Sequence, residues 1–170
     1  FNACVAAGHS AAEYARHCDT VTFCLSKGLG CPVGSVLVGS RDTIEQARHA
    51  RKALGGGMRQ AGILAAAGIY ALDHHIARMA EDHARCARLR EALGNMPGLA
   101  INEPSPTNML YVQVPDAYAF AARLAGHGVL CLPESALHVR AVLHLDIDDA
   151  ALERAIAAFA AVAQETVVSV

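Results

Sequence analysis

The sequence predicts an α/β protein, built as the end of a large α/β lobe followed by a small α+β lobe. In the first half, two short β-branched apolar runs precede long segments of helical spacing, and in the second half shorter strand and helix patterns alternate. Between the halves, residues 95–108 are dense in proline, glycine and asparagine. We therefore expect one domain over residues 1–95 and a second over residues 96–170.

The first lobe is predicted from its strand and helix patterns in order. Ser10 is a suitable N-cap for a short helix over 10–18. Residues 20–25 are β-branched and apolar at nearly every position, which is typical of a strand buried on both faces. A glycine-rich connection leads to a second strand over 35–40.

Long helices are predicted to complete the first lobe. A helix over about 41–54 is stopped by three consecutive glycines. Residues 58–93 then predict two consecutive helices or one bent helix, with a weak break near residues 73–75. The apolar stretch 61–72 is shorter than the roughly 20 residues of a membrane-spanning helix, so we expect a buried helix there.

The second lobe is predicted to have the order strand, helix, strand, strand, helix. The strands are expected over 109–114, 129–133 and 138–147, and the first helix over 117–128. The last helix, over 149–167, is expected to be capped by Asp148 or Asp149. This order predicts a small α+β lobe.

Composition excludes several classes of partner. The 170 residues are 54% hydrophobic and 18% charged, and the net charge is -2 with a pI of about 6.5. A protein of this charge lacks the basic surface that nucleic acids or anionic membranes attract, so we expect neither as a partner. The six cysteines form no CxxC pair and are expected to be free thiols in a reducing, cytoplasmic compartment: Cys4, Cys18, Cys24, Cys31, Cys86 and Cys131.

The histidines do not predict a metal site. Of the nine histidines, His74 and His75 are adjacent and so point to different faces of a helix, and His83 lies well beyond them. We interpret them as ordinary helix-surface residues and expect no bound metal.

Lys27 directly follows the first predicted strand. A lysine attacks a carbonyl only after losing its proton, and apolar surroundings at the end of a buried strand would lower its pKa by disfavouring the ammonium form. Ser26 can donate a hydrogen bond nearby, and the following glycines leave room for a flat ligand. The glycines match neither a P-loop nor a dinucleotide-binding fingerprint. The alternative is an inert, solvated surface lysine.

Three blocks of sequence resemble, in the same order, the low-specificity L-threonine aldolases. They are "TFCLSKGLGCPVGSVLVGS", "ARHARKALGGGMRQAGILAAAGIYAL" and "VRAVLHLDI". These aldolases are pyridoxal-phosphate (PLP) enzymes of the aspartate-aminotransferase-like fold, fold type I. The resemblance covers nearly the whole chain and implies that it corresponds to the C-terminal half of such an enzyme. Segments that hold the phosphate, the ring and the pyridine nitrogen have no counterpart here, so we expect the chain alone to be inactive.

The resemblance also implies the site residues. It makes Lys27 the catalytic Schiff-base lysine that holds PLP, and it places Ser26 against the cofactor. Lys52 and Arg59 would lie near the phosphate of PLP across a subunit interface, and Arg140 would bind the substrate carboxylate. For the last three, the alternative is a solvated surface cation. A site at a subunit interface implies a homodimer or a homotetramer.

The implied reaction is the cleavage of L-threonine, L-allo-threonine or a related β-hydroxy-α-amino acid to glycine and an aldehyde. Two alternatives stay open: another fold type I lyase that catalyses β-elimination, and a non-catalytic, truncated fragment that only oligomerises. Cys31 stands where the family usually has alanine, and Leu143 where threonine is common. We expect both to be tolerated packing changes.

Overall fold

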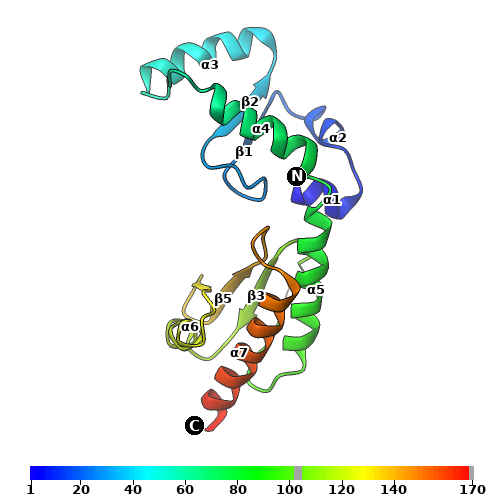
Figure 1. Ribbon diagram of the computed structural model, residues 1–170, viewed down its shortest axis with the longest axis vertical. Helices are drawn as coiled ribbons and strands as arrows, with labels where there is room; N and C mark the ends of the chain where they lie inside the picture. The colour runs from blue at the N-terminus through cyan, green and yellow to red at the C-terminus, as the bar shows by residue number, and fades with distance from the viewer. Residues whose placement is uncertain (102–104, 169–170) are drawn as a thin grey trace. The chain divides into compact units, whose positions relative to one another are not determined.

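The computed structural model of the protein describes residues 1–101 and 105–168 (Figure 1). The chain divides into two compact units, Phe1–Met79 and Ala80–Val170. This division precedes the boundary that we expected at residue 95, because Cys86, Leu89 and Leu93 pack into the core of the second unit. Of the predicted boundary segment 95–108, residues 102–104 lie outside the described residues. The assignment of residues 1–95 as a cofactor-binding domain stays a prediction.

The first unit begins with two short helices and a two-stranded sheet. Helix α1, Asn2–Ala7, was not predicted; helix α2, Ala11–Ala15, has Ser10 as its N-cap. Strands β1, Thr20–Cys24, and β2, Ser35–Gly39, pair antiparallel. The expectation that the first strand is buried on both faces is wrong. Residues of β1 are exposed or half-buried, because β2 is its only neighbour in the described part of the chain.

Two longer helices follow the sheet. Helix α3, Arg41–Ala53, begins at the N-cap Ser40, and helix α4, Gly62–His74, ends at the predicted break. The expectation that residues 61–72 form a buried helix is half wrong: the helix is present, but Ile63 is 84% exposed and Ile69 is 63% exposed. Only Gly68 and Ala71 of α4 are buried, and both belong to the side of the helix that packs against the β1–β2 connection, where Gly68 lies beside Leu25.

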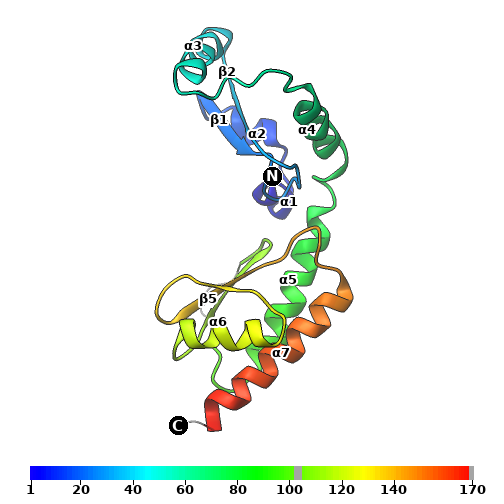
Figure 2. The same ribbon diagram turned by 60° about the vertical axis from the view of Figure 1, so that its left-hand side comes forward.

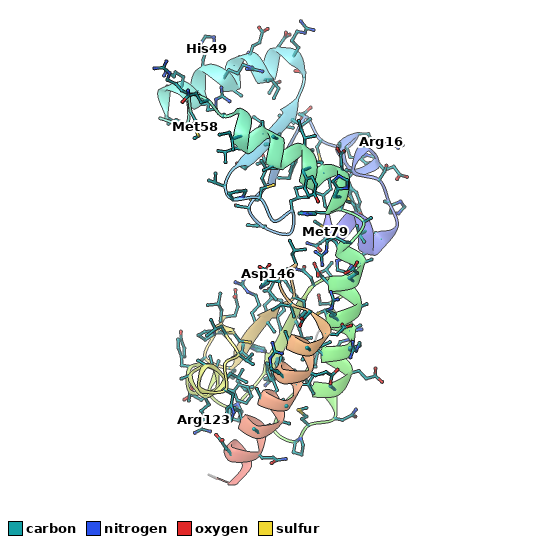
Figure 3. All side chains as sticks on the ribbon, viewed as in Figure 1. Arg16, His49, Met58, Met79, Arg123 and Asp146 are labelled. Atoms are coloured by element: carbon teal, nitrogen blue, oxygen red, sulfur yellow. The ribbon has the colours of Figure 1, made fainter. Side chains whose placement is uncertain are left out.

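A small hydrophobic cluster holds the first unit together. Its buried members are Leu25, Leu29, Cys31, Ala71 and Met79. Figure 3 labels Met79, the first residue of the next helix. Three of the five come from the connection between β1 and β2, so this connection is the best-packed part of the unit.

The second unit is a three-stranded antiparallel sheet packed against helices. Its elements are α5, Met79–Gly94; β3, Met109–Gln113; α6, Ala117–Gly126; β4, Leu132–Pro133; β5, His138–Val142; and α7, Asp149–Val168. The strand order is β3-β5-β4. Helices α5 and α7 run side by side (Figures 1 and 2), joined by ion pairs from Arg85 and Arg88 to Asp149 and Glu153. A large apolar core fills the space between helices and sheet.

Two strands of this unit are shorter than predicted. Only Leu132 and Pro133 of the segment 129–133 pair, and the strand predicted over 138–147 ends at Val142. The chain leaves the sheet at Leu143, whose N–H donates to the Asn108 carbonyl while the Asn108 side chain donates to the Leu143 carbonyl, both at 2.8 Å. Of the two predicted caps of α7, Asp148 is the one used, since it accepts from the Ala151 N–H at 2.7 Å.

No helix in the described ranges is both long enough and apolar enough to cross a membrane. In the same ranges, no three His, Cys, Asp or Glu side chains lie together in a way that could hold a metal ion. All six cysteines are free thiols.

Candidate active site

The connection between β1 and β2 contains Lys27 and is closed by backbone hydrogen bonds. The Gly30 N–H donates to the Lys27 carbonyl at 2.8 Å, and the Cys31 N–H donates to the Leu25 carbonyl at 3.0 Å. Gly30 has φ 72°, a left-handed conformation that favours glycine. These bonds hold the backbone of the loop in one turn, with Lys27 at its start.

Side chains along the loop separate into an anchored set and an exposed pair. Leu25 is 8% exposed and Leu29 is 1% exposed, whereas Ser26 and Lys27 between them are exposed. The apolar, half-buried surroundings that we expected for Lys27 are therefore absent from the described chain, because the two leucines occupy the apolar positions. The loop therefore exposes the amine of Lys27 while the flanking Leu25 and Leu29 side chains hold it against the core of the unit.

Gly28 fits a narrow space beside Lys27. A Cβ at this position would lie 3.1 Å from Asn2 Nδ2 and 3.2 Å from Met79 Cε, closer than most real Cβ contacts. The close approach of these two side chains therefore favours glycine at residue 28.

Two side-chain contacts tie the loop to helix α4. His75 Nδ1 lies 2.6 Å from the Leu29 carbonyl oxygen, and Cys31 Sγ lies 3.5 Å from the Ala67 carbonyl oxygen. The sequence predicts a helix-surface position for His75. The sequence carries no local signal for its contact, because the two residues lie 46 positions apart.

Lys52 and Arg59 lie on either side of the glycine-rich segment between α3 and α4. Lys52 is in the last turn of α3, and Arg59 follows Met58, which Figure 3 labels, just before α4 begins. Both side chains are exposed. A Cβ on Gly57 would lie 2.9 Å from Lys52 Cδ, so Lys52 folds back against this segment.

Arg140 lies in the second unit, on β5 between β3 and β4. Its register partners are Tyr111 and Leu132. Arg140 Nη1 lies 3.2 Å from Glu134 Oε2, and its Nε is buried with no hydrogen-bond partner. The guanidinium is therefore held at Nη1 by Glu134.

Cysteine chemistry does not contribute a nucleophile in the second unit. Burial raises the pKa of Cys86 and that of Cys131 to about 11. Both thiols are therefore protonated near neutral pH, and a protonated thiol is a poor nucleophile. Burial also lowers the pKa of His83, although the nearby Asp82 opposes the shift. The exposed amine of Lys27 is the stronger candidate for carbonyl chemistry.

Comparison with known proteins identifies the family. The family model of the beta-eliminating lyases matches residues 1–117. The chain belongs to the beta-eliminating lyase family. It is 41% identical over 165 residues to the probable low-specificity L-threonine aldolase 2 of Arabidopsis thaliana, a match that covers 94% of this chain and 46% of that protein. It is 48% identical over 149 residues to the low specificity L-threonine aldolase of Escherichia coli K12, covering 86% of this chain and 44% of that protein.

These identities confirm the resemblance to the low-specificity L-threonine aldolases that the three sequence blocks predicted. This chain spans less than half the length of these curated relatives.

The fold class of the chain is also confirmed by solved structures. Serine palmitoyltransferase of Sphingomonas wittichii matches with a TM-score of 0.73 at 20% identity, covering 92% of this chain and 42% of that one. A Listeria monocytogenes protein assigned as an L-allo-threonine aldolase matches with a TM-score of 0.74 at 20% identity, covering 94% and 48%. The predicted fold type I architecture is therefore correct.

Proposed function

We propose that this chain carries the cofactor lysine and the substrate arginine of a PLP-dependent aldehyde-lyase. The enzyme cleaves L-threonine, L-allo-threonine or a related β-hydroxy-α-amino acid to glycine and an aldehyde. The single observation that supports this most strongly is the exposed amine of Lys27 on a loop closed by backbone hydrogen bonds and anchored by Leu25 and Leu29. The names of the relatives at 41% and 48% identity supply the substrate class.

The residues of the first unit fit the cofactor. An exposed primary amine suits an aldehyde, and a neighbouring exposed hydroxyl, that of Ser26, suits a polar ring substituent. The exposed cations Lys52 and Arg59, with the free N–H groups at the start of α4, suit a phosphate. PLP, when bound, supplies an electron sink for the negative charge left on Cα when the Cα–Cβ bond breaks.

Arg140 of the second unit is the proposed partner of the substrate carboxylate. A guanidinium binds a carboxylate through two parallel hydrogen bonds, which fixes the orientation of the amino acid as well as its position. The contact of Nη1 with Glu134 limits the rotation of the guanidinium. The role of Arg140 is thus to hold the substrate so that one bond at Cα is aligned for cleavage.

We further propose that the enzyme is a homodimer or homotetramer whose sites lie at a subunit interface, and that it acts in the cytoplasm. The interface follows from the expected role of Arg59 and Lys52, which serve a neighbouring subunit. The compartment is supported by six cysteines that are all free thiols.

Borohydride reduction tests the proposal. The complete protein is incubated with PLP, reduced, digested and mapped by mass spectrometry. We expect the phosphopyridoxyl label on Lys27 and loss of that label in Lys27→Ala. A label on another lysine, with residue 27 unmodified, would show that the proposed site is wrong.

One alternative function is supported by the name of the matched family, which describes β-elimination. Product analysis with threonine separates the two reactions: glycine and acetaldehyde indicate aldol cleavage, and a keto acid with ammonia indicates elimination. A non-catalytic oligomerising fragment would instead give a folded oligomer with no absorbance change when PLP is added.

A further inference from the structure

The end of helix α4 contacts the lysine loop, the connection of residues 25–34 between β1 and β2, through one side chain. His75 is the C-cap residue of α4, and its backbone N–H donates to the Ala71 carbonyl at 2.8 Å. Its ring Nδ1 lies 2.6 Å from the carbonyl oxygen of Leu29. A carbonyl oxygen only accepts hydrogen bonds, so Nδ1 must carry the hydrogen and donate it.

The acceptor belongs to a peptide group that also holds Lys27. The Leu29 carbonyl and the Gly30 N–H are the two ends of one planar peptide unit. The carbonyl end accepts from His75, and the N–H end donates to the Lys27 carbonyl at 2.8 Å. His75 therefore fixes the rotation of the same plane that fixes the backbone of Lys27.

Besides His75, the contact described for this plane is the bond from the Gly30 N–H to the Lys27 carbonyl at 2.8 Å. The Leu29 side chain is 1% exposed and anchors its Cα, but a peptide plane can rotate between two fixed Cα positions. Gly30, on the far side of the plane, adopts φ 72° and has no side chain that resists such a rotation. The ring of His75 is itself oriented by Tyr70, with centroids 5.5 Å apart in an edge-on arrangement.

We propose that His75 is a positioning residue for Lys27: its Nδ1–H holds the Leu29–Gly30 peptide so that the lysine amine projects in one direction toward the aldehyde of PLP. This inference rests on the proposed function of Lys27. It adds to that function a residue from a different helix, far away in sequence.

The test compares side chains of equal shape that differ in the donor. In His75→Asn the amide Nδ2 stands at the same number of bonds from Cα as Nδ1 and can donate, whereas His75→Leu has the same branching and no donor. His74→Leu is the matched control, since His74 is the exposed neighbour at the end of α4. Circular dichroism first establishes that each variant is folded; His75→Ala serves as the donor-free variant if the leucine variant is not.

Two readouts are made on the complete protein: hydrogen exchange of the loop peptide, residues 25–34, and the rate at which PLP and borohydride label Lys27. We expect exchange about 5- to 10-fold faster and labelling about 5- to 10-fold slower in His75→Leu, with His75→Asn and His74→Leu close to the wild type, since one hydrogen bond is lost.

The outcomes distinguish the positioning role of His75 from the proposed cofactor role of Lys27. If Lys27 is labelled equally fast in the wild type and in the leucine variant, and the loop exchanges equally, the positioning role is wrong and the cofactor lysine stands. If Lys27 is not labelled in the wild type, the proposed function is wrong. Failure of His75→Asn to restore labelling would also overturn the positioning role, because the donor would then not be the group that matters.

Discussion

Arg140 shows at the scale of one residue how the structure sharpens a sequence prediction. Sequence resemblance selects this arginine, and the structure adds that Glu134 holds Nη1 at 3.2 Å while Nε is buried and unpartnered. A buried donor without a partner is costly, so a ligand or a rearrangement that satisfies it is favoured. The side chain is therefore placed to gain from binding a carboxylate.

We expect Arg140→Ala to raise KM for threonine about 10- to 100-fold in the complete enzyme, because hydrogen bonds to a charged partner are lost. Arg140→Lys should restore only part of the affinity, since an ammonium cannot form the paired contact. Steady-state kinetics measure both. Arg154→Ala, at an exposed arginine of α7, is the control and should leave KM unchanged. An unchanged KM in Arg140→Ala would rule out the carboxylate role.

The two thiols with raised pKa values, those of Cys86 and Cys131, give a second prediction at this scale. Burial raises the pKa of Cys86 and Cys131 to about 11, while Cys18 is exposed. In the folded protein at pH 8, iodoacetamide should therefore alkylate Cys18 well before Cys86 or Cys131, as peptide mapping will measure. The folded thiols ionise at a higher pH than the unfolded ones, so their contribution to stability is present below pH 9 and is lost as pH rises toward 11. Equal alkylation rates at all three would contradict the burial.

The candidate site could be predicted from sequence only in part. The position of Lys27 after a strand and of Lys52 near a helix end follow from local patterns, and the structure agrees with both placements. The exposure of Lys27 and the contact of His75 with Leu29 could not be predicted, because both depend on packing between segments far apart in sequence.

At the scale of elements, capping residues decide where helices begin. Asp116 caps α6 by accepting from the Tyr118 and Ala119 N–H groups, both at 3.0 Å. Loss of such a cap leaves helix N–H groups without a protein partner.

Asp116→Ala should therefore lower the free energy of unfolding of the second unit by about 1 kcal/mol, as urea denaturation followed by circular dichroism would measure. Asp146→Ala is a matched control, because Asp146, labelled in Figure 3, has an 86% exposed side chain in the segment before α7. A loss of equal size in both variants would show that the cap is not responsible.

Element type was predictable along most of the chain, but burial was not. The strands at Thr20–Cys24 and Ser35–Gly39 and the helix at Gly62–His74 follow from composition and spacing. Their exposure does not, because an apolar pattern shows that a segment can be buried and not that a partner surface is present. Strand β4 is short for a different reason: pairing of the segment 129–133 depends on where β5 lies, which local composition does not encode.

At the scale of the whole molecule, the two units differ in how much apolar surface they bury. The second unit has an extensive core of leucine, valine and phenylalanine side chains, whereas the first has one small cluster around the lysine loop. Because buried apolar area is the main source of stability, the two units should unfold separately.

We expect residues 80–168 expressed alone to fold and to unfold cooperatively, as thermal denaturation will measure. In the full chain, hydrogen exchange should be slowest in α5, β3 and α7 and faster throughout the first unit. A single transition with equal protection in both units would contradict this expectation. The control is the Leu110→Ala variant, which should destabilise only the second unit, by about 3 kcal/mol.

The share of the relatives that the chain spans leads to a prediction for activity. The match covers 46% and 44% of the two curated aldolases. We expect the 170-residue chain with added PLP to release no glycine from threonine, because the resemblance implies that groups which hold the cofactor ring lie outside it. The Escherichia coli relative assayed in parallel is the positive control, and glycine release by the chain would overturn the expectation.

The two-stranded sheet has a practical consequence. Each strand of the β1–β2 pair has one neighbour among the described residues, so each offers a free row of backbone donors and acceptors. A strand from another protein, joined ahead of Phe1, could pair with one of these free edges through backbone hydrogen bonds. Hybrids made in this way would keep the lysine loop unchanged while the strand beside it is exchanged, so the proposed site could be rebuilt around a constant Lys27.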